Sequence, residues 1–139
     1  MKWIGKLHLI FGFLMFGVFL YTGQFMDKNY NHLADMSDLP RALMRAQHLY
    51  ILLAALINIG LGSYLTISQD KIVRSFQIFG TILIIAATFL LVLSFFKELP
   101  SDQIERPMCR KALYLILAGV LGHGVPMLLM SFVKQSPNK

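Results

Sequence analysis

Three histidines could do chemistry in this chain because they lie within or beside long apolar stretches: His8, His48 and His123. A neutral imidazole inside a membrane can carry a proton or ligate a haem iron. For His8 we favour a simpler interpretation, an interfacial position that lipid headgroups wet. For His48 we favour a position at the edge of the bilayer, beside Tyr50.

His123 has the most unusual surroundings of the three. Three glycines lie within four residues of it, and Pro126 is expected to kink the helix and to free the carbonyl of Gly122. We expect His123 to point into a helix bundle, and it is the first candidate if a single residue carries function. We favour a structural role, in which its ring bonds to that carbonyl or to Asn58.

A basic stripe precedes the second apolar stretch. Arg41, Arg45 and His48 are spaced i, i+4 and i+7, which puts them on one face of a helix. That face could bind a lipid headgroup, a carboxylate or a haem propionate, so Arg41 and Arg45 are candidate anion-binding or headgroup-binding residues. We favour the alternative in which both arginines only snorkel to the membrane surface.

Small residues repeat along two of the apolar stretches and predict close helix packing. Ala54, Asn58 and Gly62 recur every four residues, so Asn58 can hydrogen-bond across a helix interface. Ala118 and Gly122 have the same spacing in the last stretch. We therefore assign helix packing to Ala54, Gly62, Ala118 and Gly122, and a polar contact between helices to Asn58.

These residues belong to four stretches without Asp, Glu, Lys or Arg: 7–26, 46–69, 75–96 and 112–133. A helix needs roughly 20 apolar residues to cross about 30 Å of hydrocarbon, and each stretch is that long. The first stretch is longer than a usual signal-peptide core, and no small-residue cleavage site follows it. The sequence predicts one all-α domain over residues 1–139, an antiparallel bundle of four transmembrane helices with spans at about 4–26, 42–67, 73–96 and 110–133. The third helix is expected to face lipid over much of its surface.

Composition supports the membrane class and limits the partners. Hydrophobic residues make up 56% of the chain and charged residues 14%, against about 25% charged residues in soluble proteins. The net charge of +6 comes from single basic residues at the ends of apolar stretches, which suits lipid headgroups and not a nucleic acid. Cys109 is the only cysteine, so one chain can form neither a disulfide nor a Cys-based zinc site. The predicted partner is the lipid bilayer, with a homodimer or a larger membrane complex left open.

Basic residues nearly balance across the two sides of the predicted bundle. The side with both termini carries six Lys and Arg residues, and the opposite side carries seven. Lys2 and Lys6 precede the first helix, whereas only Lys28 follows it closely. This asymmetry favours an orientation with both termini in the cytoplasm.

The apolar stretches argue against several kinds of chemistry. None of them contains an Asp or Glu, which disfavours proton-coupled antiporters and ion pumps. The chain also lacks a phosphate-binding glycine loop, an HExxH, a CxxC and a serine-nucleophile motif. We therefore lean towards a protein without enzymatic activity.

Haem b between facing histidines is the cofactor hypothesis that stays open. At about 1.5 Å per residue, His8 and His48 should lie near opposite membrane surfaces and His123 roughly 15 Å from either. No two of these histidines would then share a level. A haem would need a five-coordinate iron, a methionine ligand or a pair of His123 side chains across a dimer axis, so we predict no cofactor and no metal.

Segments 6–8 (KLH) and 45–53 (RAQHLYILL) resemble small uncharacterised bacterial four-helix integral membrane proteins. The resemblance implies a bacterial inner membrane and no particular activity. The function that we predict is that of a non-enzymatic accessory or assembly protein of the membrane. The alternatives are a redox protein linked to b-type haem or quinone and, less favoured, a channel or carrier for a small neutral or lipidic ligand.

Overall fold

The computed structural model describes residues 3–100 and 104–134, with side chains described as far as residue 129. Long helices make up most of these two ranges, and no strand occurs in them: α1 Trp3–Tyr30, α2 Asp38–Tyr64, α3 Lys71–Lys97 and α4 Pro107–Lys134. A short 3-10 helix, η1 Asn31–Leu33, follows α1 directly. Each of the four long helices is long and apolar enough to cross a membrane. The predicted all-α class is confirmed, and the helices suggest a multi-pass membrane protein.

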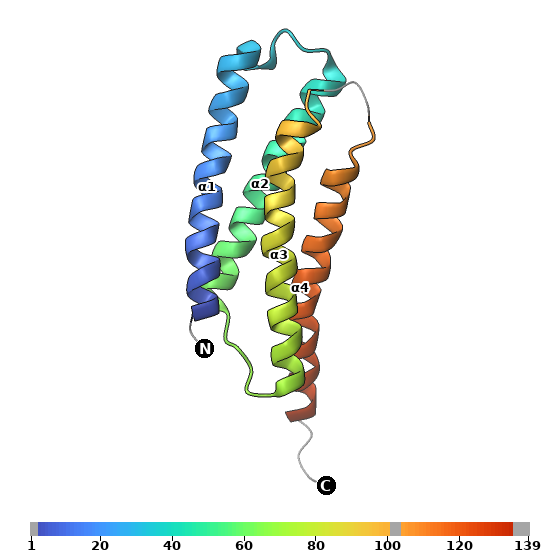
Figure 1. Ribbon diagram of the computed structural model, residues 1–139. Helices are drawn as coiled ribbons and strands as arrows, with labels where there is room; N and C mark the ends of the chain where they lie inside the picture. The colour runs from blue at the N-terminus through green and yellow to red at the C-terminus, as the bar shows by residue number, and fades with distance from the viewer. Residues whose placement is uncertain (1–2, 101–103, 135–139) are drawn as a thin grey trace.

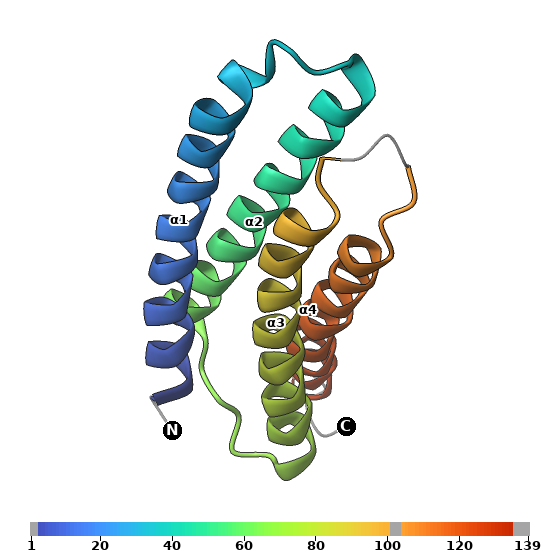
Figure 2. The same ribbon diagram turned by 45° about the horizontal axis from the view of Figure 1, so that its top comes forward.

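The four helices form two pairs that lie side by side (Figure 1). α1 packs mainly on α2, α3 packs mainly on α4, and contacts between α2 and α3 join the pairs. We call the end where α1 begins and α4 ends the terminal end, and the opposite end the distal end. At the terminal end, α3 and α4 extend beyond α1 and α2 in Figure 1, and α3 also does so in Figure 2. The two pairs are therefore offset along the long axis of the molecule.

Carboxylates fix the points at which α3 and α4 begin. The Asp70 side chain accepts hydrogen bonds of 2.9 and 3.0 Å from two backbone N–H groups in the first turn of α3. Glu98, just after α3, accepts from the N–H groups of Met108 at 2.7 Å and Cys109 at 3.1 Å in the first turn of α4. These bonds satisfy donors that a helix start leaves free, and the negative charges suit the positive end of the helix dipole.

Glycines let the backbones within each pair approach closely. A Cβ on Gly62 of α2 would lie 2.5 Å from the backbone nitrogen of Leu9 in α1. A Cβ on Gly80 of α3 would lie 2.7 Å from the carbonyl oxygen of Gly119 in α4. Gly62 thus lies at a helix interface, as its spacing predicts. Ala118 is exposed on the outer surface, and its neighbour Gly119 makes the close contact instead.

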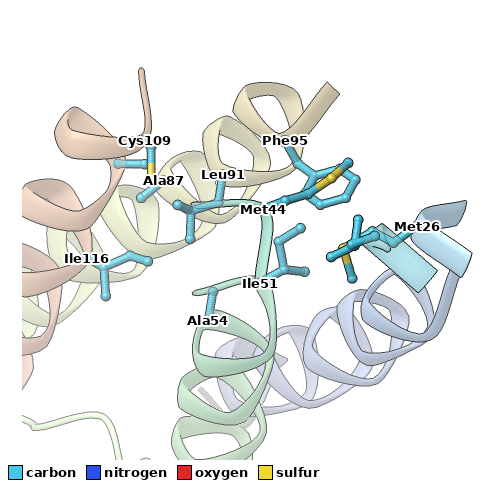
Figure 3. Packing of buried hydrophobic residues seen from close by; sticks show 11 residues of the cluster. Met26, Met44, Ile51, Ala54, Ala87, Leu91, Phe95, Cys109 and Ile116 are labelled. Atoms are coloured by element: carbon cyan, nitrogen blue, oxygen red, sulfur yellow. The ribbon is translucent and has the colours of Figure 1, made fainter. Parts of the chain in front are cut away.

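An apolar core fills much of the space between the four helices (Figure 3). Its buried residues are Met26, Leu33, Met44, Ile51, Ala54, Ala87, Leu91, Phe95, Cys109, Ala112 and Ile116. Ala54 belongs to this core, in line with its predicted packing role. Gly122 is half-buried, and a Cβ there would only come into ordinary contact with the Phe76 carbonyl oxygen, at 3.4 Å.

α3 is the most buried of the four helices, yet large apolar side chains such as Ile72, Phe79 and Ile82 are exposed on it, which agrees with the expectation that it faces lipid over much of its surface. Its buried residues recur at helical spacing: Val73, Gln77, Gly80, Thr81, Ile84, Ala87, Thr88, Leu91, Ser94 and Phe95. The helix contacts both α2 and α4. Hydrophobicity alone does not separate its buried face from its exposed face, because a helix that is apolar all round suits lipid and the interior of a bundle equally well.

Candidate functional site

Polar side chains from all four helices meet inside the bundle. They are His8 of α1, Asn58 of α2, Thr81 and Thr88 of α3, and His123 of α4. We call these five residues the central cluster. Each is at most 6% exposed, so its hydrogen bonds must be made within the protein.

His8 and Asn58 form the first link of the central cluster. The His8 ring nitrogen Nδ1 lies 2.7 Å from the Asn58 side-chain oxygen. The Asn58 amide nitrogen donates to the Ala54 carbonyl at 2.8 Å and to the Thr88 hydroxyl at 3.3 Å. Because the amide oxygen can only accept, His8 Nδ1 carries the proton of their shared bond. Asn58 therefore hydrogen-bonds across a helix interface, as its position between Ala54 and Gly62 in the four-residue repeat predicts.

Thr81 joins the two histidines of the cluster. Its hydroxyl oxygen lies 3.1 Å from His8 Nε2 and 3.3 Å from His123 Nε2, and the Gln77 carbonyl is also in reach at 3.0 Å. A neutral His8 with its proton on Nδ1 has a hydrogen-bond acceptor at Nε2. The Thr81 hydroxyl, which has a single proton, can donate a hydrogen bond to this atom. His123 then donates from Nε2 to the Thr81 oxygen. Both ring nitrogens that face Thr81 are satisfied in this way.

His123 ends the cluster with an unused ring nitrogen. Its Nδ1 is buried and has no hydrogen-bond partner in the described part of the chain. With the proton on Nε2, this atom carries only a lone pair, and no N–H donor is left unpaired. Thr81, and neither Asn58 nor the Gly122 carbonyl, is the partner of the ring. The five residues include no carboxylate that would balance an imidazolium, so the neutral form suits both rings.

His8 and His123 meet although the sequence placed them at different depths. Their ring centroids lie 6.0 Å apart, with the planes inclined by 76°. His8 is fully buried, so the expectation that headgroups wet it is wrong. The offset between the helix pairs explains the difference, because α4 runs beyond α1 at the terminal end and its inner turns come level with the start of α1 (Figure 1).

His48 lies apart from the central cluster, between α1 and α2. Its Nδ1 is 2.9 Å from the Thr22 hydroxyl, and its ring stacks on Phe19 with the centroids 4.2 Å apart. Gln24 and Asp27 line a surface cavity of about 420 Å³ beside it. His48 is half-buried and borders this polar cavity, which suits the predicted position at the edge of a bilayer.

The fold divides the basic stripe of α2. Arg41 donates to the backbone carbonyls of Leu33 at 3.0 Å, Ala34 at 3.3 Å and Met36 at 2.5 Å. These bonds fix the connection between α1 and α2 and leave Arg41 few donors for an external anion. Arg45, in contrast, is exposed.

A second buried polar group lies near the distal end, and sequence reasoning missed it. Arg106, just before α4, donates from Nη1 to the Gln47 side-chain oxygen at 2.9 Å. Gln47 donates in turn to the Ser94 hydroxyl, which donates to the Leu91 carbonyl at 2.8 Å. The usable signal was Gln47 itself, since an amide within an apolar stretch needs a polar partner from another helix.

The central cluster can hold a proton, but it lacks the parts of a metal site. Among residues 3–100 and 104–129, no group of three or more His, Cys, Asp or Glu side chains could hold a metal ion. Thr81 lies between the two imidazoles, and the backbones of Gly80 and Gly119 are in contact beside them. A haem ligated by both histidines would have to displace Thr81 and separate α3 from α4.

Comparisons with protein-family models, curated proteins and solved structures found no match. The functional conclusion therefore depends on the geometry of this chain. Within residues 3–100 and 104–129, the central cluster and the buried Arg106 are the features on which that conclusion is built.

Proposed function

We propose that this protein is an integral membrane protein, an antiparallel four-helix bundle without enzymatic activity that acts as an accessory or assembly partner. The observation that carries the proposal is the central cluster, in which all four helices pair their polar groups with one another. The core of a bilayer contains no water for such groups, so hydrogen bonds between helices help to hold a bundle together there. Large apolar side chains on the outer surface suit the same environment.

The burial of the cluster residues supports a structural role for the cluster. Four cavities of about 360 to 540 Å³ are lined by other residues, and none of them reaches a cluster residue. An enzyme or a carrier that used His8 or His123 would need such an opening for its substrate.

α4 offers the surface that best suits a protein partner. As far as Leu129, it is the least buried of the four helices, and its outer face carries large apolar side chains. Gly124 lies exposed among them, with nothing within 4 Å of the place where its Cβ would be. A second helix can approach the backbone closely at such a point.

Native electrophoresis of the full-length protein in a mild detergent tests the proposal. The wild type is expected to resist carbonate extraction from membranes and to migrate as part of an assembly larger than one chain. Gly124→Trp should abolish the larger assembly, because the indole occupies the contact surface of α4. Gly17→Trp is the matched control, since Gly17 is also exposed with open space at its Cβ but lies on α1.

Three outcomes would contradict the proposal at different points. Release of the wild type by carbonate would refute the membrane assignment. Migration as a single chain in every mild detergent would refute the accessory role. Loss of the assembly in both tryptophan variants would refute the choice of α4 as the contact surface.

A redox protein that binds b-type haem is the second candidate. The two buried imidazoles, with centroids 6.0 Å apart, favour it, although a haem between them would first have to displace Thr81. Absorption spectroscopy after expression with a haem precursor distinguishes it from the first. A Soret band in the wild type that is lost in both His8→Ala and His123→Ala would support the redox function. A colourless wild-type protein would rule it out.

A further inference from the structure

A buried cation near the distal end has an incomplete set of hydrogen bonds. Arg106 is 9% exposed, and its Nη1 donates to Gln47. Its Nε and Nη2 are buried without a partner in the described part of the chain. A guanidinium stays charged at physiological pH, and a buried donor without an acceptor is costly. The surroundings of Arg106 therefore lack an acceptor that its charge and geometry call for.

Among the described residues, the two glutamates nearest to Arg106 in the sequence, Glu98 and Glu105, do not supply that acceptor. Glu98 binds the backbone N–H groups at the start of α4. Burial lowers the pKa of the Arg106 guanidinium, and the negative charge of Glu98 acts in the opposite direction. Glu105 is exposed, and neither glutamate forms an ion pair with Arg106. An acceptor from outside the chain would complete the site.

Arg106 lines a cavity of about 360 Å³ between α2 and the start of α4. Its lining residues are Tyr50, Ile104, Glu105, Arg106, Cys109, Arg110, Leu113 and Tyr114. Arg106 and Arg110 outweigh the single carboxylate of Glu105, so the lining is basic by one charge. Leu113 and the tyrosine rings make part of its wall apolar, and the tyrosine hydroxyls add donors. Tyrosines are also typical of the headgroup level of a membrane. The cavity thus suits an amphiphile with a negatively charged head.

We propose that Arg106 and Arg110 bind the phosphate of an anionic phospholipid whose acyl chain lies along α2 and α4. The planar donors of a guanidinium match phosphate oxygens, which would accept the bonds that Arg106 leaves unmade. A zwitterionic lipid fits less well, because its cationic group would lie close to two arginines. This inference rests on the membrane location in the proposed function. It places an anion site at the start of α4, beside the predicted candidates Arg41 and Arg45 in α2.

Lipid titration of the detergent-solubilised full-length protein, followed by native mass spectrometry, tests the inference. The wild type should bind phosphatidylglycerol about tenfold more tightly than phosphatidylcholine. Arg110→Gln should weaken phosphatidylglycerol binding by about the same factor, and so should Arg106→Gln. Arg45→Gln is the matched control, since Arg45 is an exposed arginine near the same end of the bundle, and it should change the affinity less than about twofold.

Arg110→Gln keeps the test decisive if Arg106→Gln fails to fold after Gln47 loses its partner, because Arg110 is exposed. Equal binding by Arg110→Gln, Arg45→Gln and the wild type would overturn the inference. Inorganic phosphate that binds as tightly as phosphatidylglycerol would also overturn it, because the acyl chain would then contribute nothing. If the protein stays in carbonate-washed membranes but shows no lipid preference, only this inference is refuted. If carbonate releases the protein, the proposed function is refuted.

Discussion

Replacement of Asn58 by Leu is expected to lower the free energy of unfolding by about 1 to 3 kcal/mol. The Asn58 side-chain oxygen accepts a hydrogen bond from the His8 Nδ1–H group at 2.7 Å, and both side chains are fully buried. Leu cannot accept this bond, so the His8 N–H group loses its partner in the interior. Thr88 loses only the hydrogen bond that it accepts from the Asn58 amide, because its hydroxyl still donates to the Ile84 carbonyl at 2.7 Å.

The size of the effect follows from two terms. A hydrogen bond between helices in a membrane contributes about 0.6 kcal/mol on average and up to about 1.7 kcal/mol. A buried donor that loses its acceptor costs about 1 to 3 kcal/mol. Leu is close to Asn in size and adds apolar contacts, which offset part of this loss. The unpaired His8 donor keeps the net effect destabilising.

Thermal unfolding of the full-length protein in detergent, followed by far-ultraviolet circular dichroism, measures this effect. A loss of 1 kcal/mol lowers the melting temperature of a domain by roughly 2 to 8 °C. Ser63→Leu is the matched control on the same helix, because Ser63 is exposed and bonds only to the Ile59 carbonyl at 2.9 Å. We expect the control to stay within about 0.5 kcal/mol of the wild type.

A double variant separates the hydrogen bond from simple packing. His8→Leu in the Asn58→Leu background removes the unpaired donor together with its former acceptor. The double variant should therefore be more stable than the sum of the two single losses predicts. An Asn58→Leu protein that unfolds at or above the wild-type temperature would refute the assignment of Asn58 as an essential polar contact. Strict additivity would refute the coupling to His8.

Two further predictions use the same protein in detergent. Gly80→Ala should lower the free energy of unfolding by about 1 to 3 kcal/mol, because its Cβ would lie 2.7 Å from the Gly119 carbonyl oxygen. Gly60→Ala is the control and should be neutral or slightly stabilising, because nothing lies within 4 Å of its Cβ position. Equal melting temperatures of the two variants would contradict the close packing of α3 on α4. Asp70→Ala should cost about 0.5 to 2 kcal/mol and speed hydrogen exchange in the first turn of α3, and Asp70→Asn should retain most of the cap. Unchanged exchange in Asp70→Ala would contradict the capping role.

Local composition determined the helices of this protein. Four stretches of at least 20 residues without a charged residue predict helices of membrane length, and four long helices occur at these places. A helix satisfies its backbone hydrogen bonds within its own segment, so this prediction needs no knowledge of distant contacts. α1 continues to Tyr30, beyond the end of its apolar stretch, because a helix does not have to end where the apolar residues do.

Polar residues within the apolar stretches also carried information about the site. An amide or an imidazole there must find a partner inside the bundle, and Asn58 and His123 are both buried and hydrogen-bonded. The sequence could not name their partners. His8 is 50 positions from Asn58 and 73 positions from Thr81, so no local pattern connects them.

Only the tertiary structure decided which faces point inward and at what height the helices meet. A bilayer and a bundle interior are both apolar, so hydrophobic periodicity does not separate the inner face of α3 from an outer one. The heights depend on steric fits between distant segments, such as Gly62 against Leu9 and Gly80 against Gly119. The resulting offset of the two helix pairs buries His8 and brings it level with His123, which counting residues from the start of each helix could not reveal.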